Sequence, residues 1–157
     1  MNPCSDNVTL PVKVRFLSEL CTPEDFAYAT NGSAGIDLRA CTTTPIIIEP
    51  GQRHRFSTGI ATEITMPGVA GFVYSRSGLG TKEGLVVSQG VGIIDPDYRG
   101  EILVSLLNTS TEARTVTPGQ RIAQLVFQPF FRAAIIPVAE LSSTERGAGG
   151  FGHTGKS

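Results

Sequence analysis

The sequence predicts an all-β protein with a sandwich or jelly-roll architecture, and three observations support this class. Its apolar stretches are short, and many alternate with polar residues or are rich in β-branched residues, as β-strands are. The 18 glycines and 10 prolines fall between these stretches, where they are typical of turns. No segment carries the period of a helix longer than about two turns. Many short strands joined by turns favour a jelly roll.

The strands are expected where apolar runs lie between turn residues. Segment 12–16 alternates valine or phenylalanine with lysine or arginine, which is typical of a half-buried strand. Segment 46–48 consists of three isoleucines between Pro45 and the Pro50-Gly51 turn. The other expected strands are 34–40, 53–56, 60–64, 71–74, 85–87, 102–108, 114–116, 121–127 and 133–138.

Segment 75–84 interrupts the β pattern and is expected to hold one short helix that starts near Ser77. Strand 85–87 then continues through Gln89 and Gly90 toward the turn at Asp95. The two arms on either side of Gly90 are expected to pair as a β-hairpin.

The chain is expected to form one domain over residues 1–141, which is long enough to bury a core. Residues 1–10 are interpreted as a loose leader. Residues 142–157 are rich in glycine and poor in core residues, so we expect a flexible arm. Phe151 stands among glycines between Arg146 and Lys156, a composition that suits a lid over an aromatic, anionic ligand.

Composition and charge argue against several classes of protein. The net charge of -1 gives no field that would attract nucleic acid or an acidic membrane, so neither is an expected partner. No apolar run approaches the ~20 residues that span a bilayer. Cys4, Cys21 and Cys41 have neither disulfide-framework nor zinc-site spacing. The N-terminus lacks the pattern of a signal peptide, and a cytoplasmic location is therefore expected.

Residues 92–101 form the clearest candidate site. Asp95, Pro96 and Asp97 make a sharp turn, and Tyr98 follows it. Two carboxylates and a phenol on a rigid turn can form a site. The alternative is a surface hairpin whose aspartates only bond backbone amides, and the segment taken alone favours that alternative.

Five segments, taken together, change that interpretation. Their order, spacing and content closely resemble the five motifs of the trimeric dUTPase family, over roughly residues 12 to 155. Any one of these motifs is weak evidence, but five in order are specific. The segments are 34–40, 75–79, 92–101, 119–126 and 146–155.

The resemblance implies a jelly-roll or distorted β-barrel subunit with a glycine-rich arm that closes over the active site. It also implies a homotrimer with active sites at the subunit interfaces, each taking its third motif from one subunit, the first, second and fourth from another, and the arm from the third. The implied reaction is hydrolysis of dUTP to dUMP and pyrophosphate with Mg²⁺ on the triphosphate. This reaction keeps uracil out of DNA and supplies dUMP for dTMP synthesis.

The resemblance also assigns roles to individual residues. Asp95 matches the carboxylate that orients and deprotonates the attacking water, and Tyr98 matches the aromatic against the deoxyribose. Asp37 matches the carboxylate that contacts the metal through water. The remaining matched residues bind substrate: Gln89, Gly92 and Ile94 at the uracil, Arg76, Ser77, Gly78 and Gln124 at the phosphates, and Arg146, Gly150, Phe151 and Gly152 in the arm.

Other interpretations remain beside this one. A protein of the same fold that binds dUTP as a regulator is one alternative, and a dCTP deaminase is a less favoured one. Gln89 stands where many members carry asparagine, and His153 where serine is common. Arg99 and Glu101 are interpreted as interface or surface charges rather than catalytic groups.

Overall fold

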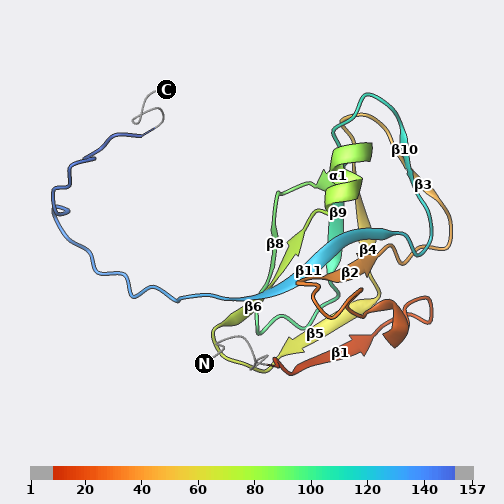
Figure 1. Cartoon of the computed structure of the whole chain (residues 1–157), viewed down its shortest axis with the longest axis horizontal. Helices are drawn as coiled ribbons and strands as arrows, with labels where there is room; N and C mark the ends of the chain where they lie inside the picture. The colour runs from red at the N-terminus through yellow and green to blue at the C-terminus, as the bar shows by residue number, and fades with distance from the viewer. Residues whose placement is uncertain (1–8, 151–157) are drawn as a thin grey trace.

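The computed structural model describes residues 9–150, and within that range the protein is built from short strands with little helix (Figure 1). The elements are β1 (Val12–Phe16), η1 (Pro23–Asp25), β2 (Ile36–Arg39), β3 (Ile46–Ile48), β4 (Arg53–Ser57), β5 (Ile60–Ile64), β6 (Val69–Tyr74), α1 (Ser77–Glu83), β7 (Leu85–Val87), β8 (Gly92–Ile94), β9 (Leu103–Asn108), β10 (Arg114–Val116) and β11 (Arg121–Pro129). The all-β class and the short helix at Ser77 are therefore confirmed.

The strands form two main antiparallel sheets and two ribbons. One sheet has the order β2-β11-β6-β8 and the other has the order β4-β9-β7. The ribbons pair β1 with β5 and β3 with β10. Strand β11, late in the chain, lies between β2 and β6, so most of the pairing joins segments that are distant in sequence (Figure 1).

The core lies between the inward faces of the two sheets. Alternate residues of each strand point into it, because side chains on a strand alternate between its two faces. Leu38 and Leu125 come from the first sheet, and Phe56 and Leu106 come from the second; all four are fully buried. Burial of each such side chain contributes about 1.5–3 kcal/mol.

The expected hairpin between strands 85–87 and 92–94 is wrong. Strand β7 pairs with β9, whereas β8 pairs with β6 in the other sheet. A turn at Gly90, with φ +81°, carries the chain from one sheet to the other. This crossing lets both Val87 and Ile94 enter the core between the sheets. Strands β8 and β9 also belong to different sheets, so the turn at Asp95 is not the tip of a surface hairpin.

The expected strand at 133–138 is also wrong. Residues 130–150 contain no strand and run away from the sheets (Figure 1). Phe131 is fully exposed, and Ile135 and Ile136 are 84% and 78% exposed. The segment has strand-like composition, but within residues 9–150 it has no neighbouring strand with which to pair.

The cysteines differ in their surroundings. Cys21 is buried and its thiol donates a hydrogen bond to the Thr58 carbonyl oxygen at 2.8 Å, whereas Cys41 is only partly buried. Burial raises the pKa of the Cys21 thiol from 9.0 to about 11. Cys21 therefore stays protonated at pH 8, and the thiolate is the form that reacts with alkylating agents.

We expect iodoacetamide at pH 8 to label Cys41 well before Cys21 in the folded protein. Peptide mass spectrometry over a time course measures both rates. In denaturant the two rates should converge, since the fold is the cause of the difference. Equal rates in the folded protein would contradict the buried environment of Cys21.

Candidate functional site

Three adjacent strands bring one group of the predicted residues together. Asp37 on β2 lies opposite Gln124 on β11, and Gln124 lies opposite Tyr74 on β6. Arg76 follows two residues after Tyr74. The Gln124 side-chain amide donates to the Ser75 carbonyl oxygen at 3.0 Å, which fixes the start of the segment that leads into α1.

Asp37 is the electrostatic centre of this group. Arg76 Nε donates to one of its carboxylate oxygens at 2.8 Å, and the Arg121 guanidinium donates to the other at 3.1 Å. Two guanidinium groups around one carboxylate leave a net positive charge, so the group suits an anionic ligand. Sequence reasoning did not select Arg121, although it lies in the fourth motif, three residues before Gln124.

A hollow of about 280 Å³ opens over this group. Its polar lining comes from Ser33, Asp37, Arg76, Ser77 and Gln124. The backbone amides in the first turn of α1, at Ser77 and Gly78, have no acceptor within the helix, as at any helix start. Arginine side chains and free amides together can bind phosphate groups.

Two glycines shape this hollow: Gly35 leaves room for the Gln124 side chain, and Gly78 leaves the start of α1 open. A Cβ at position 35 would lie 2.9 Å from the Gln124 side-chain oxygen, so a larger residue would displace Gln124. A Cβ at Gly78 would meet no atom within 4 Å, which leaves the helix start open to a ligand.

The second group of predicted residues lies at β8 and the loop after it. Strand β8 is an edge strand, so its outer backbone groups are free to bond a planar base as a neighbouring strand would. Gly92 lies close to its neighbours, since a Cβ there would be 3.2 Å from the Val73 Cβ and 3.3 Å from the side-chain nitrogen (Nε2) of Gln89. Ile94 points into the core, so only its backbone faces outward.

The loop after β8 holds Asp95 and Tyr98. The Tyr98 amide donates to the Asp95 carbonyl oxygen at 3.1 Å, which closes a tight turn. The Asp95 side chain is exposed, and Tyr98 is 42% exposed. The Tyr98 hydroxyl donates to the Glu101 carbonyl oxygen at 2.9 Å. An exposed carboxylate on a fixed turn can accept a proton from a bound water.

The structure does not bring the two groups together within one chain. Ile94 pairs with Gly71 on β6, and Arg76 lies five residues further along the chain, just past the end of β6, about 17 Å away at the rise of a strand. Asp95 continues from Ile94 in the opposite direction. The hollow over Asp37 and Arg76 accordingly has no residue of segment 89–98 in its lining.

The arm residues are only partly described. Arg146 is exposed and its Nε donates to the Gly149 carbonyl oxygen at 2.9 Å, within a turn at Gly147. Gly150 is also exposed. Phe151, Gly152 and His153 lie outside the described residues.

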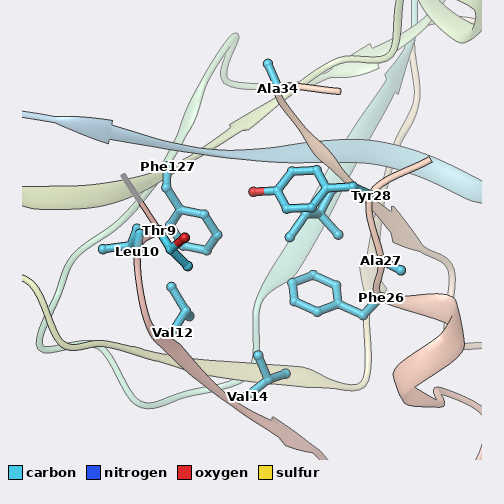
Figure 2. Close-up of a pocket in the computed structure, with 10 residues that line it drawn as sticks. Thr9, Leu10, Val12, Val14, Phe26, Ala27, Tyr28, Ala34 and Phe127 are labelled. Atoms are coloured by element: carbon cyan, nitrogen blue, oxygen red, sulfur yellow. The ribbon is translucent and has the colours of Figure 1, made fainter. Parts of the chain in front are cut away.

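A larger hollow lies elsewhere, at β1 and the segment after η1. Figure 2 shows Val12, Val14, Phe26, Tyr28 and Phe127 around a groove of about 560 Å³. No charged side chain lines this groove, so it lacks the arginine groups that suit a phosphate. Between these two hollows, size alone would favour the groove, whereas the chemistry of the lining favours the hollow at Arg76.

Two further features bear on location and metal. Within residues 9–150, no helix is long and apolar enough to cross a membrane. In the same range, no three histidine, cysteine, aspartate or glutamate side chains gather as a metal-binding group.

Comparisons with known proteins agree with this geometry. The model of the dUTPase family matches residues 23–155 of the chain. The deoxyuridine 5'-triphosphate nucleotidohydrolase of Idiomarina loihiensis is 54% identical over 130 residues, which cover 83% of this chain and 86% of that protein.

Solved structures of dUTPases share the fold. The dUTPase of Staphylococcus bacteriophage 80alpha with dUPNHPP is 26% identical, has a TM-score of 0.78, and the match covers 94% of this chain and 100% of that one. A mutant dUTPase of phage phi11 of S. aureus, whose structure shows the coordination of a structural Mg(II) ion, has a TM-score of 0.74 at 23% identity, covering 85% of this chain and 99% of that one.

Proposed function

This chain belongs to the dUTPase family, and from that premise we propose that it hydrolyses dUTP to dUMP and pyrophosphate. The proposal rests on one observation: the same chain carries two features that suit the two halves of dUTP. A strand edge with an exposed turn carboxylate suits a base and an attacking water, and an arginine-lined hollow suits a triphosphate. Neither a purely regulatory dUTP-binding role nor dCTP deamination is favoured by the family match.

Asp95 acts as the general base. Its carboxylate orients a water in line with the α-phosphorus and takes one proton as the water oxygen attacks. The new bond joins that oxygen to the α-phosphorus, and the bond that breaks joins the α-phosphorus to the oxygen bridging to the β-phosphorus. Pyrophosphate leaves with that bridging oxygen. Arg76 and the amides of Ser77 and Gly78 stabilise the charge that develops on it.

The edge of β8 and Tyr98 select the nucleotide. Backbone groups of Gly92 and Ile94, with the Gln89 side chain beside them, bond the uracil and leave no room for the thymine methyl. The Tyr98 ring lies against the deoxyribose and excludes a ribose 2′-hydroxyl. A wrong base leaves buried polar groups unpaired, at a cost of about 1–3 kcal/mol each.

The residues present fit a Mg²⁺ that is held mainly by the substrate. Mg²⁺ keeps several waters and takes one or two carboxylates together with phosphate oxygens. Both Asp37 oxygens accept from arginine, but each keeps a further lone pair that can bond a metal-bound water. The ion would neutralise charge on the triphosphate.

The active unit is a homotrimer whose sites are shared between subunits. The distance between the Asp95 loop and the Arg76 hollow within one chain supports this, since both must contact the same nucleotide. The apolar segment 131–141 adds support, because several large apolar side chains there lack cover in the single chain. Residues 142–157 form the arm, whose Arg146, Gly150, Phe151 and Gly152 close over the nucleotide. The protein works in the cytoplasm.

The direct test measures pyrophosphate release with Mg²⁺ from dUTP, dTTP, dCTP and UTP in parallel. We expect turnover of dUTP at a kcat/KM at least ~100-fold above that for the other three. Binding of dUTP without cleavage would instead support a regulatory protein. Release of ammonia from dCTP would support a deaminase.

A further inference from the structure

Glu101 lies where the Asp95 loop rejoins the body of the protein, and its side chain is partly buried. One carboxylate oxygen accepts the Gly59 amide at 2.7 Å, and the other accepts the Ser57 hydroxyl at 3.1 Å. Bonds to an ionised acceptor are roughly twice as strong as bonds between neutral groups. The interpretation of Glu101 as an interface or surface charge misses both contacts.

The turn between β4 and β5, which Glu101 contacts, is itself held by hydrogen bonds. The Thr58 hydroxyl donates to the Ile102 carbonyl oxygen at 2.7 Å, and the Ile102 amide donates to the Ile60 carbonyl oxygen at 2.8 Å. The Thr58 carbonyl also accepts the buried Cys21 thiol. Since Thr58 and Ile102 are fully buried, the anchor for Glu101 belongs to the core.

The loop on the other side of Glu101 depends on this anchor. Its own hydrogen bonds are local. The Tyr98 backbone amide donates to the Asp95 carbonyl, and the Arg99 guanidinium donates to the Pro96 and Tyr98 carbonyls. The Tyr98 hydroxyl reaches back to the Glu101 carbonyl oxygen. A Cβ on Gly100 would overlap that hydroxyl, so the ring folds closely over the chain just before Glu101.

We propose that Glu101 is a positioning residue for the Tyr98 ring and the Asp95 turn. Its two hydrogen bonds hold the end of their loop against the turn between β4 and β5. This inference rests on the role of Tyr98 in the proposed function. It predicts that loss of the two Glu101 hydrogen bonds changes substrate choice as well as rate, because the position of the Tyr98 ring decides whether a 2′-hydroxyl fits.

The test compares Glu101→Ala and Glu101→Gln for kcat/KM on dUTP and on UTP, with melting temperature measured for each. We expect Glu101→Ala to lower kcat/KM for dUTP by about 10- to 100-fold and to lower the dUTP-to-UTP ratio by at least about tenfold. Glu101→Gln keeps a side-chain oxygen for the Gly59 amide and should retain most of that ratio. Ser57→Ala removes one of the two bonds and should give an intermediate ratio even if Glu101→Ala folds poorly.

Two controls separate positioning from general loss of stability. Asn108→Ala removes buried hydrogen bonds to the Ile48 and Glu112 carbonyls at the far end of β9, so it should lower the melting temperature and leave the ratio unchanged. Tyr98→Ala should lower the dUTP-to-UTP ratio of kcat/KM directly. A Tyr98→Ala protein that still rejects UTP overturns the proposed role of Tyr98. If Tyr98→Ala relaxes the ratio and Glu101→Ala does not, the positioning role of Glu101 alone is wrong.

Discussion

Replacement of Asp95 by asparagine is expected to lower kcat for dUTP hydrolysis by roughly 10²–10⁴-fold, the usual contribution of a general base. Asparagine has nearly the same shape and can still bond a water, but it cannot take the proton. The Asp95 side chain is exposed, so the substitution leaves the core packing unchanged. Pyrophosphate release measures the rate, and titration calorimetry measures dUTP binding, which should remain close to that of the parent.

Asp97→Asn is the matched control, because it makes the same chemical change two residues later in the same exposed turn. We expect Asp97→Asn to retain activity within about twofold, the small effect usual for a surface substitution. An equal loss in both variants would mean that the charge of the turn matters rather than one base. An active Asp95→Asn protein would remove Asp95 from the mechanism.

The local structure was predictable because it depends on short sequence patterns. The strand at 12–16 and the strand at 46–48 have the expected bounds, since alternation, β-branching and bounding prolines act over a few residues. The helix starts at Ser77 as expected. Partners of strands were less predictable. Strands β7 and β8 are neighbours in sequence but enter different sheets, because each contributes core residues to its own sheet.

The residues of the candidate site could be selected as motifs, but their contacts could not be predicted. Asp37 and Gln124 were selected from separate motifs, and the structure places them opposite each other on paired strands. Arg121 and Glu101 were not selected, because their contacts are with atoms from distant parts of the chain. The exposed segment 131–141 has the pattern of a strand, yet pattern alone does not supply a partner strand.

The separation of Asp95 from Arg76 gives the second prediction with a large effect. Asp95→Asn and Arg76→Ala should each be nearly inactive alone, and a refolded equal mixture of the two should regain activity. One chain then supplies an intact Arg76 and the other an intact Asp95. If each site of a closed ring joins one ordered pair of subunits, about a quarter of the sites contain both intact residues. The mixture should therefore reach about a quarter of the parent kcat per site.

A second mixture tests which residues come from the same chain. Asp95 and Tyr98 lie on one loop and are linked by a backbone hydrogen bond, so Asp95→Asn mixed with Tyr98→Ala should show no activity beyond that of the Tyr98→Ala chains it contains. No site in that mixture can take an intact Asp95 and an intact Tyr98 from one chain. Recovery of activity in the first mixture alone would therefore mean that Asp95 and the hollow at Arg76 come from different subunits. If neither mixture recovers activity although native mass spectrometry shows mixed oligomers, the roughly 17 Å between Ile94 and Arg76 must instead close by a change of conformation within one chain.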